Sequence, residues 1–213
     1  MRPETKQALV RKNSGADPPY LEFIPLTVPS LSHRFNLRGG RSRPPVCPFA
    51  GAGQVQAEQV HGKLVVTVTA ADRDLLIPAA DALVTNCARL TLTIRAADCG
   101  PVYLYDPARR AIGLAHSGNR GTALNITAAT VSAMTRAFGS RPRDLIVVLG
   151  PCIRPPDYEI DFAAAIGRQA ADAGVTHYYD CGLNTAGDLA QFYSHRRERG
   201  RTGRHYAWLM LNP

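Results

Sequence analysis

Residues 93–121 read TIRAADCGPVYLYDPARRAIGLAHSGNRG, and this stretch decides the fold. Residues 89–95 alternate between apolar and polar side chains, and residues 111–115 form a short apolar run, so both are predicted strands. Residues 102–106 lie between them, and Asp106-Pro-Ala-Arg109 is typical of a turn. The stretch therefore predicts neighbouring strands, with chemically reactive side chains at their ends.

Cys99 and His116 each follow an apolar, β-prone run, which places them at the ends of these strands. A third residue of this kind, His61, precedes the strand-like segment 63–68. Two imidazoles and one thiolate suit zinc, and three protein ligands leave a fourth position for water or substrate. The residues leave a second hypothesis open, in which Cys99 is a nucleophile and a histidine is its base. Asp98 would orient a histidine in either case.

Downstream of this stretch, the spacing of apolar residues changes from that of a strand to that of a helix. The apolar residues that recur at helical spacing, before a stop at Gly139, are Leu124, Ala128, Val131, Met134 and Phe138. Residues 144–150 then predict a buried strand, and Asp161 is placed to cap a second helix over residues 162–173. With a last strand over residues 204–211, this order indicates a layered α/β core.

The upstream part of the chain has weaker patterns. Residues 20–24 predict a first strand, and residues 81–86 predict another short one. Residues 1–19 are polar and contain prolines, so we expect a flexible N-terminal arm. No internal repeat or linker divides the remainder, which predicts a single catalytic domain over residues 20–213.

The composition limits the classes of protein that fit. No run of about 18 apolar residues is present, which excludes a membrane-spanning helix, and the N-terminus lacks the apolar core of a signal peptide. The five cysteines are an odd number without disulfide-scaffold spacing, so we expect a cytoplasmic protein. A net charge of +8 indicates either a solvated basic surface or a preference for anionic ligands such as phosphate, nucleotides or nucleic acid. No zinc-finger, aromatic RNA-binding or helix-turn-helix pattern supports specific nucleic-acid binding.

Three basic segments are candidates for binding anions. Asn119-Arg-Gly-Thr122 precedes a predicted helix, where backbone amides and a guanidinium together bind anions, although a solvent-facing arginine is an equal alternative. Residues 194–204 predict a basic loop that contains glycines, and such a loop is either a solvated surface or a phosphate-binding element. Arg38 precedes Gly39-Gly40, a turn that lets a ligand approach the backbone.

Seven segments, in this order, together resemble one known family. They are Gln59-Val-His-Gly62, Ala80-Asp-Ala-Leu-Val-Thr85, Ala97-Asp-Cys-Gly-Pro101, Ala115-His-Ser-Gly-Asn-Arg-Gly121, Gly150-Pro-Cys-Ile-Arg-Pro-Pro-Asp-Tyr-Glu159, Phe192-Tyr-Ser-His-Arg-Arg197 and Thr202-Gly-Arg204. The chain resembles, over about residues 35–211, the purine nucleoside phosphorylases earlier described as laccase-domain or multicopper polyphenol oxidase proteins. The ordered set is specific, although each segment alone is not.

The resemblance implies a zinc site built from His61, Cys99 and His116. It also implies a single-domain α+β fold in which mixed β-sheets are flanked by helices. The implied activity is phosphorolysis of adenosine, inosine and methylthioadenosine, with adenosine deaminase activity at the same site. The implied partners are therefore a small-molecule nucleoside and phosphate.

The implied reaction assigns roles to several further residues. Arg38, Arg120 and Arg204 are the phosphate-binding candidates, because arginine can hold phosphate bidentately. Cys99, Asp98 and Arg120 are the candidate catalytic residues. The thiolate of Cys99 would tune the metal and assist proton transfer.

The chain departs from the family pattern in three places. Asn119 stands where the family usually has tryptophan, the glycine-rich loop after Phe35 is one residue short, and the segment between Gly40 and Gln59 is shorter than usual and lacks the Asn-Arg element expected there. Two alternatives to the phosphorylase therefore remain: a cysteine hydrolase or amidase that edits peptidoglycan precursors through Cys99, and a catalytically weakened nucleotide-binding member of the family. Copper oxidase chemistry ranks below these, because six histidines are too few for the usual mononuclear-plus-trinuclear copper set.

Overall fold

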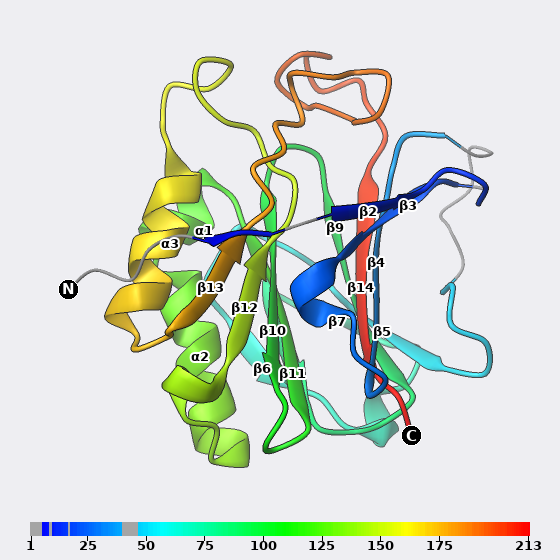
Figure 1. Ribbon diagram of the computed structural model, residues 1–213, viewed down its shortest axis with the longest axis vertical. Coiled ribbons are helices and arrows are strands. Elements are labelled where there is room, and N and C mark those ends of the chain that lie inside the picture. Colours follow the sequence, from blue (N-terminus) through cyan, green and yellow to red (C-terminus); the bar gives the residue numbers. More distant parts are fainter. Residues whose placement is uncertain (1–5, 9, 17, 40–46) are drawn as a thin grey trace.

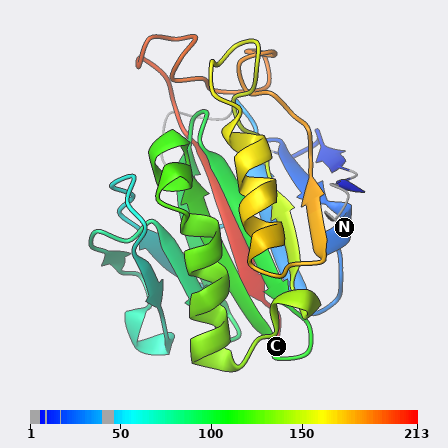
Figure 2. The same ribbon diagram turned by 90° about the vertical axis from the view of Figure 1, so that its left-hand side faces the viewer.

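The structure is a computed structural model that describes residues 6–8, 10–16, 18–39 and 47–213. In these residues, two seven-stranded mixed sheets pack face to face, and helices cover the outer face of the first sheet (Figure 1). The turned view shows the two longer helices lying across that sheet (Figure 2). This is the single-domain fold of mixed sheets flanked by helices that the sequence predicts.

The first sheet has the strand order β1-β13-β12-β10-β11-β8-β6. In chain order its strands are β1 (Lys6–Gln7), β6 (Val65–Thr67), β8 (Ala82–Thr85), β10 (Gly100–Asp106), β11 (Ala111–Ser117), β12 (Ile146–Leu149) and β13 (His177–Asp180). Every residue of β8, β10 and β11 is buried, because helices cover one face of the sheet and the second sheet covers the other. These strands form the centre of the molecule.

The second sheet has the strand order β2-β3-β4-β14-β9-β5-β7. In chain order its strands are β2 (Val10–Asn13), β3 (Tyr20–Phe23), β4 (Leu31–Asn36), β5 (Gly53–Ala57), β7 (Leu76–Ile77), β9 (Leu90–Ala96) and β14 (His205–Leu211). Strand β14 lies between β4 and β9 and pairs antiparallel with both. The last strand predicted from the sequence is therefore confirmed as a central one.

The hairpin of β10 and β11 brings the two ends of residues 93–121 together. Its register pairs Gly100 with Ser117 and Asp106 with Ala111. The carboxylate of Asp106 closes the predicted turn by accepting hydrogen bonds from the backbone N–H groups of residues 108 and 109. Because Pro101 pairs with His116, Cys99 comes to lie beside the end of β11.

The predicted helices form, with one change at the start of the first. Helix α2 (Ile126–Phe138) ends at Gly139, whose φ of 69° is the left-handed conformation expected of a C-terminal glycine. Asn125 is also left-handed and separates α2 from the short helix α1 (Asn119–Ala123), so Leu124 lies outside α2. Helix α3 (Phe162–Asp172) begins as predicted, because the carboxylate of Asp161 accepts a hydrogen bond from the N–H of Ala164.

The structure differs from the prediction of a flexible arm over residues 1–19. Strand β1 pairs in parallel with β13, and β2 pairs antiparallel with β3, so these segments belong to the two sheets. Their residues are largely exposed, which explains why no apolar pattern marks them. Residues 1–5, 9, 17 and 40–46 lie outside the described part of the chain, and they include Gly40 of the predicted glycine turn. Within the described part, no helix is both long enough and apolar enough to cross a membrane.

Candidate functional site

Three residues far apart in the sequence come together at one end of the first sheet. His61 lies in the loop between β5 and β6, Cys99 directly precedes β10, and His116 lies in β11. Their ligand atoms, one nitrogen from each imidazole and the Cys99 sulfur, all lie within 4.8 Å of one another. The two imidazole rings meet edge to face, with their centroids 4.9 Å apart. The grouping predicted from the strand ends is therefore present.

The carboxylate of Asp81 holds this group together from behind. One oxygen accepts hydrogen bonds from the backbone N–H of His61 and from Nδ1 of His116, both at 3.0 Å. The other oxygen accepts from the N–H groups of Val60 (3.2 Å) and Gly62 (2.6 Å). Since Asp81 binds Nδ1 of His116, Nε2 is the atom left free for a metal ion.

Gln59 attaches the same loop to the second sheet. Its side-chain amide accepts a hydrogen bond from the N–H of Arg95 at 2.8 Å and donates one to the carbonyl of Arg95 at 2.5 Å. Both Gln59 and His61 have left-handed backbone conformations, with φ of 68° and 61°. Such conformations persist only where the surroundings hold them, and Gln59 and Asp81 supply those contacts.

Gly118 gives the sulfur atom its space. A Cβ at this position would overlap the Cys99 sulfur and approach the ring of His61. The glycine in Ala115-His-Ser-Gly-Asn-Arg-Gly121 is therefore required by the close approach of the thiol to the backbone.

The electrostatics of the group favour a thiolate and a charged imidazole. Burial acts to raise the pKa of Cys99, but hydrogen bonds from His116 and His61 outweigh it and lower the pKa to about 6. Burial acts to lower the pKa of His116, but hydrogen bonds with Asp81 and Cys99 outweigh it and raise the pKa to about 9. At neutral pH the sulfur is therefore ionised, which is the form that binds metals and attacks electrophiles.

The donor set fits a bound metal ion. It supplies two imidazole nitrogens and one thiolate, and one carboxylate behind them fixes the ring of His116. Three protein ligands leave a position for substrate or water, as in catalytic metal sites. The same geometry also suits a Cys99–histidine nucleophile pair, so the structure keeps both sequence hypotheses.

The group opens into a pocket of about 740 Å³. Four arginines line the pocket: Arg95, Arg120, Arg196 and Arg204. Among the described residues, no carboxylate forms an ion pair with any of these arginines except Arg196, which pairs with Glu159. Three cations beside the histidine–cysteine group are therefore available to an anionic ligand.

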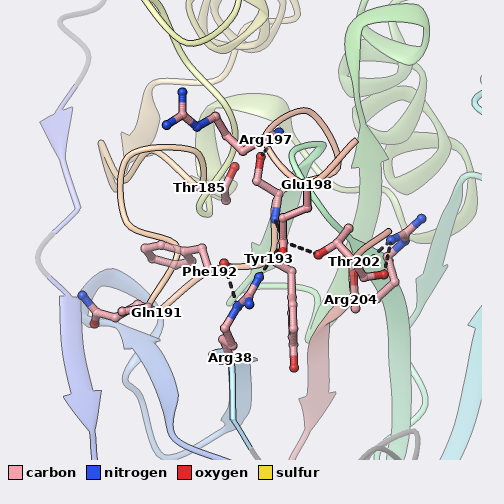
Figure 3. A network of polar contacts seen from close by, with 12 residues as sticks. Arg38, Thr185, Gln191, Phe192, Tyr193, Arg197, Glu198, Thr202 and Arg204 are labelled. Carbon is pink, nitrogen blue, oxygen red and sulfur yellow. Dashed lines mark hydrogen bonds and ion pairs between the residues drawn. The ribbon is translucent and has the colours of Figure 1, made fainter. Parts of the chain in front are cut away.

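The three predicted phosphate ligands have different positions. Arg120 in α1 and Arg204 before β14 both line the pocket. Arg38 is not among the described residues that line the pocket, and its guanidinium pairs with Glu198 at 2.5 Å. The guanidinium also lies over the ring of Tyr193, and Nε donates a hydrogen bond to the carbonyl of Phe192 (Figure 3). The structure therefore corrects the phosphate role assigned to Arg38.

Asp98 also has a role that differs from the predicted one. Its carboxylate accepts hydrogen bonds from the hydroxyl of Thr185 and from the backbone N–H of Arg196, both at 2.7 Å. The carboxylate that orients His116 belongs to Asp81 instead. The sequence places Asp98 next to Cys99, but its side chain points toward the loop of residues 194–204.

Sequence reasoning missed several residues of the site. Asp81 is predicted only as part of a strand, although it lies in the family-like segment Ala80-Asp-Ala-Leu-Val-Thr85, directly before three apolar residues. Arg95 also lines the pocket, as do two aromatic residues, Tyr158 and Phe162, whose rings meet edge to face with centroids 5.9 Å apart. Tyr158 lies within one of the seven family-like segments, which was the signal available for it.

Comparisons with known proteins agree with this arrangement. The family model described as multi-copper polyphenol oxidoreductase laccase matches residues 46–165 and 158–212. The purine nucleoside phosphorylase YlmD of Geobacillus stearothermophilus is 32% identical in an alignment 194 positions long, which covers 73% of this chain and 71% of that protein. A purine nucleoside phosphorylase of Deinococcus radiodurans is 36% identical over 187 residues, covering 76% and 72% of the two chains.

Solved structures give the same result for the fold. The crystal structure of YlmD from Geobacillus stearothermophilus superposes with a TM-score of 0.81 at 25% identity, covering 99% of this chain and all of that one. The crystal structure of the hypothetical protein YfiH from Bacillus licheniformis superposes with a TM-score of 0.76 at 26% identity, covering 88% and 98%. The architecture around the pocket is therefore shared along nearly the whole chain.

Proposed function

Since this chain belongs to the multi-copper polyphenol oxidoreductase laccase family, we propose that it is a zinc-dependent purine nucleoside phosphorylase. The observation that carries the proposal is that one pocket contains both the group of His61, Cys99 and His116 and arginines without a carboxylate partner in the described part of the chain. The names of two relatives support the reaction class. We propose adenosine, inosine and methylthioadenosine as substrates, with deamination of adenosine at the same site.

The metal would be held by His61, Cys99 and His116. Two imidazoles and a thiolate suit zinc, a borderline-soft ion without redox chemistry. When bound, zinc supplies Lewis acidity beside the substrate, which is the chemistry that deamination requires. Asp81 keeps Nε2 of His116 directed at the other two ligands by holding Nδ1.

Phosphorolysis needs a phosphate ion held beside the sugar. A phosphate oxygen forms a bond to C1′ of the ribose while the bond from C1′ to the purine nitrogen breaks, and the purine leaves with the electron pair and takes up a proton. Arg120 and Arg204 are the proposed phosphate ligands, because each lines the pocket without a carboxylate partner in the described part of the chain. Their guanidinium groups would offset the negative charge of the phosphate and orient it.

The purine base would lie against Tyr158 and Phe162. Their rings present aromatic surface to the pocket, on which a flat heterocycle can pack. Asn119 also lines the pocket and offers an amide for hydrogen bonding. We infer that these two aromatic residues take the place of the tryptophan that the family usually has at position 119.

The partners of the proposed reaction are small molecules. All five cysteines are free, as in proteins of a reducing compartment, and we propose that the enzyme acts in the cytoplasm.

The test is to incubate zinc-loaded protein of measured metal content with a panel of nucleosides, with and without phosphate. The expected products are free base and pentose 1-phosphate, formed only with phosphate, and inosine from adenosine without phosphate. Protein stripped with a chelator should lose turnover and regain it when zinc is restored. Base release that ignores phosphate would contradict phosphorolysis, and binding of nucleosides without turnover would indicate the weakened member of the family.

The lowered pKa of Cys99 favours one second candidate function. A thiolate next to two imidazoles can attack an acyl group, as a cysteine hydrolase or amidase acting on a peptidoglycan precursor would require. A Cys99→Ser protein that keeps all its zinc but hydrolyses nothing would favour this alternative. Loss of zinc together with turnover supports the role of Cys99 as a ligand.

A further inference from the structure

The loop of residues 194–204 supplies one side of the pocket, and its high positive charge opposes a fixed conformation. It carries five arginines and a single acidic residue, Glu198. His195, Arg196 and Arg204 of this loop line the pocket. Like charges so close in sequence repel one another, and the loop contains no helix or strand. Specific contacts must therefore hold it in place.

The carboxylate of Glu198 closes the loop from within. It accepts hydrogen bonds from the backbone N–H of Ser194 at 3.0 Å and from the hydroxyl of Thr202 at 2.5 Å. These partners lie near the two ends of the loop, so one side chain joins both. Figure 3 shows the contact with Thr202. Glu198 also forms the 2.5 Å ion pair with Arg38.

Arg38 is itself fixed to the body of the protein. Its backbone N–H donates a hydrogen bond to the carbonyl of Gln191, and its Nε donates to that of Phe192. The ring of Tyr193 lies under its guanidinium, 4.6 Å from ring centroid to guanidinium carbon. Arg38 therefore attaches Glu198, and with it the loop, to the segment that follows β4.

Asp98 provides a second anchor on the side of the metal ligands. Its carboxylate accepts the backbone N–H of Arg196 while it also binds the hydroxyl of Thr185. Because Asp98 precedes Cys99, this contact joins the loop to the segment that carries the thiolate. Glu198 and Asp98 thus hold the loop in addition to the ion pairs of Arg196 with Glu159 and of Arg197 with Asp157.

We propose that Glu198 is a positioning residue, which through Arg38, Ser194 and Thr202 holds the loop of residues 194–204 so that its cationic side chains can bind phosphate in the pocket. This proposal rests on the proposed function, because it assumes that the pocket binds phosphate for phosphorolysis. Glu198 touches neither substrate nor metal in this account. Burial acts to raise its pKa, but hydrogen bonds from Arg38, Thr202 and Ser194 outweigh it and lower the pKa to about 2, so the anchor stays ionised at every assay pH.

The test compares the parent with Glu198→Ala, Glu198→Gln, Arg38→Ala and the double variant Arg38→Ala/Glu198→Ala. The control is Asp144→Asn, which removes a carboxylate paired with Arg141 outside the pocket. Binding of inorganic phosphate is measured by calorimetry, zinc by metal analysis, and turnover by phosphate titration at saturating nucleoside. Brief digestion with trypsin, which cleaves after arginine, reports how often the loop opens.

We expect trypsin to cleave the loop of the Glu198→Ala protein about tenfold faster than that of the parent. The same variant should bind phosphate about tenfold more weakly. Its zinc content and its kcat at saturating phosphate should stay within about twofold of the parent's values. The reason is that the substitution weakens phosphate binding equally in the ground state and in the transition state. Glu198→Gln keeps the acceptor oxygen but not the charge, and should lie between the two. Arg38→Ala should add little in the Glu198→Ala background, because the two residues act as one unit.

Unchanged phosphate affinity in Glu198→Ala would overturn the proposal, even if the loop is cleaved faster. Additive effects of Arg38→Ala and Glu198→Ala would overturn the role of the ion pair. These outcomes leave phosphorolysis by the parent intact. A parent that binds phosphate but cleaves no nucleoside contradicts the proposed function alone, and the calorimetry then still decides the role of Glu198.

Discussion

Replacing Asp81 by asparagine should weaken both the metal site and the fold around it. In the structure, each carboxylate oxygen of Asp81 accepts two hydrogen bonds: the first from His61 N–H and His116, the second from the N–H groups of Val60 and Gly62. An asparagine has only one acceptor oxygen, so its NH₂ group faces either the N–H groups of Val60 and Gly62, or the N–H of His61 and Nδ1 of His116, which is a donor when Nε2 binds a metal. Asp81 is fully buried, and water cannot replace the lost partners.

The size of the effect follows from these contacts. Each buried donor left without an acceptor costs about 1–3 kcal/mol, so the one or two donors left unpaired cost roughly 1–6 kcal/mol of the free energy of unfolding. Loss of the carboxylate behind a metal-binding histidine typically weakens metal affinity by about ten- to a hundredfold. We therefore expect Asp81→Asn to lower the free energy of unfolding of the metal-free protein by about 3 kcal/mol and to raise the zinc Kd at least tenfold.

Urea unfolding of the metal-free protein measures the first effect, and competition with a chromophoric chelator measures the second. Asp98→Asn is the matched control. Asp98, like Asp81, is a buried aspartate near the histidine–cysteine group, but its carboxylate binds Thr185 and Arg196 rather than a histidine. The control should keep the parent's zinc affinity within about threefold. Equal zinc affinities for Asp81→Asn and the parent would refute the role assigned to Asp81.

Three further predictions concern ionisation and the metal. Cys99→Ser should lower zinc content and turnover together, measured by metal analysis and nucleoside assay; full zinc with no turnover would identify a nucleophile. His116 has a pKa of about 9 and Cys99 one of about 6, so between pH 6 and 9 zinc should displace about one proton, from His116. Zinc affinity, measured by chelator competition, should then rise roughly tenfold per pH unit in this range. An affinity that does not change with pH would contradict this. Burial lowers the pKa of His33 and of His205 to about 4, so the unfolded chain binds more protons below about pH 6.5. The free energy of unfolding should then fall by about 3 kcal/mol per histidine as the pH drops from 6.5 to 4, which urea midpoints would show; midpoints independent of pH would count against it.

The strands and the grouping of two histidines with a cysteine could be predicted because their signals are local. Alternating side chains marked β9, an apolar run marked β11, and each ligand follows or precedes such a segment. A strand end is also where a side chain can leave the sheet. For Cys99 and His116 the grouping required only that β10 and β11 pair, whereas His61 is brought in by the contact of its loop with Asp81, because β8 separates β6 from β11.

The roles of Asp81 and Arg38 could not be predicted in the same way, because their partners are distant in the sequence. Asp81 binds His116 across 35 positions, and Arg38 pairs with Glu198 near the other end of the chain. A carboxylate before an apolar run and an arginine before two glycines each have many local explanations. Only the folded chain shows which charge each one meets.

Two errors of local structure have physical causes as well. The apolar spacing extended the long helix back to Leu124, but a left-handed Asn125 interrupts it and creates the separate helix α1. Strands β1 and β2 join the edges of their sheets through backbone hydrogen bonds, which need no apolar side chains. Apolar periodicity marks segments whose side chains are buried on one face, and the side chains of β1 and β2 are largely exposed.

The most direct test of the account is whether base release consumes phosphate at the pocket of Arg120. Zinc-loaded protein is incubated with inosine and phosphate, and the products are followed by phosphorus NMR and chromatography. The account predicts equal amounts of hypoxanthine and ribose 1-phosphate, and an Arg120→Ala protein with intact zinc should need about ten- to a hundredfold more phosphate, since a charge-assisted hydrogen bond is worth roughly 1.5–3 kcal/mol. Free ribose in place of ribose 1-phosphate, or a phosphate dependence unchanged in Arg120→Ala, would contradict it.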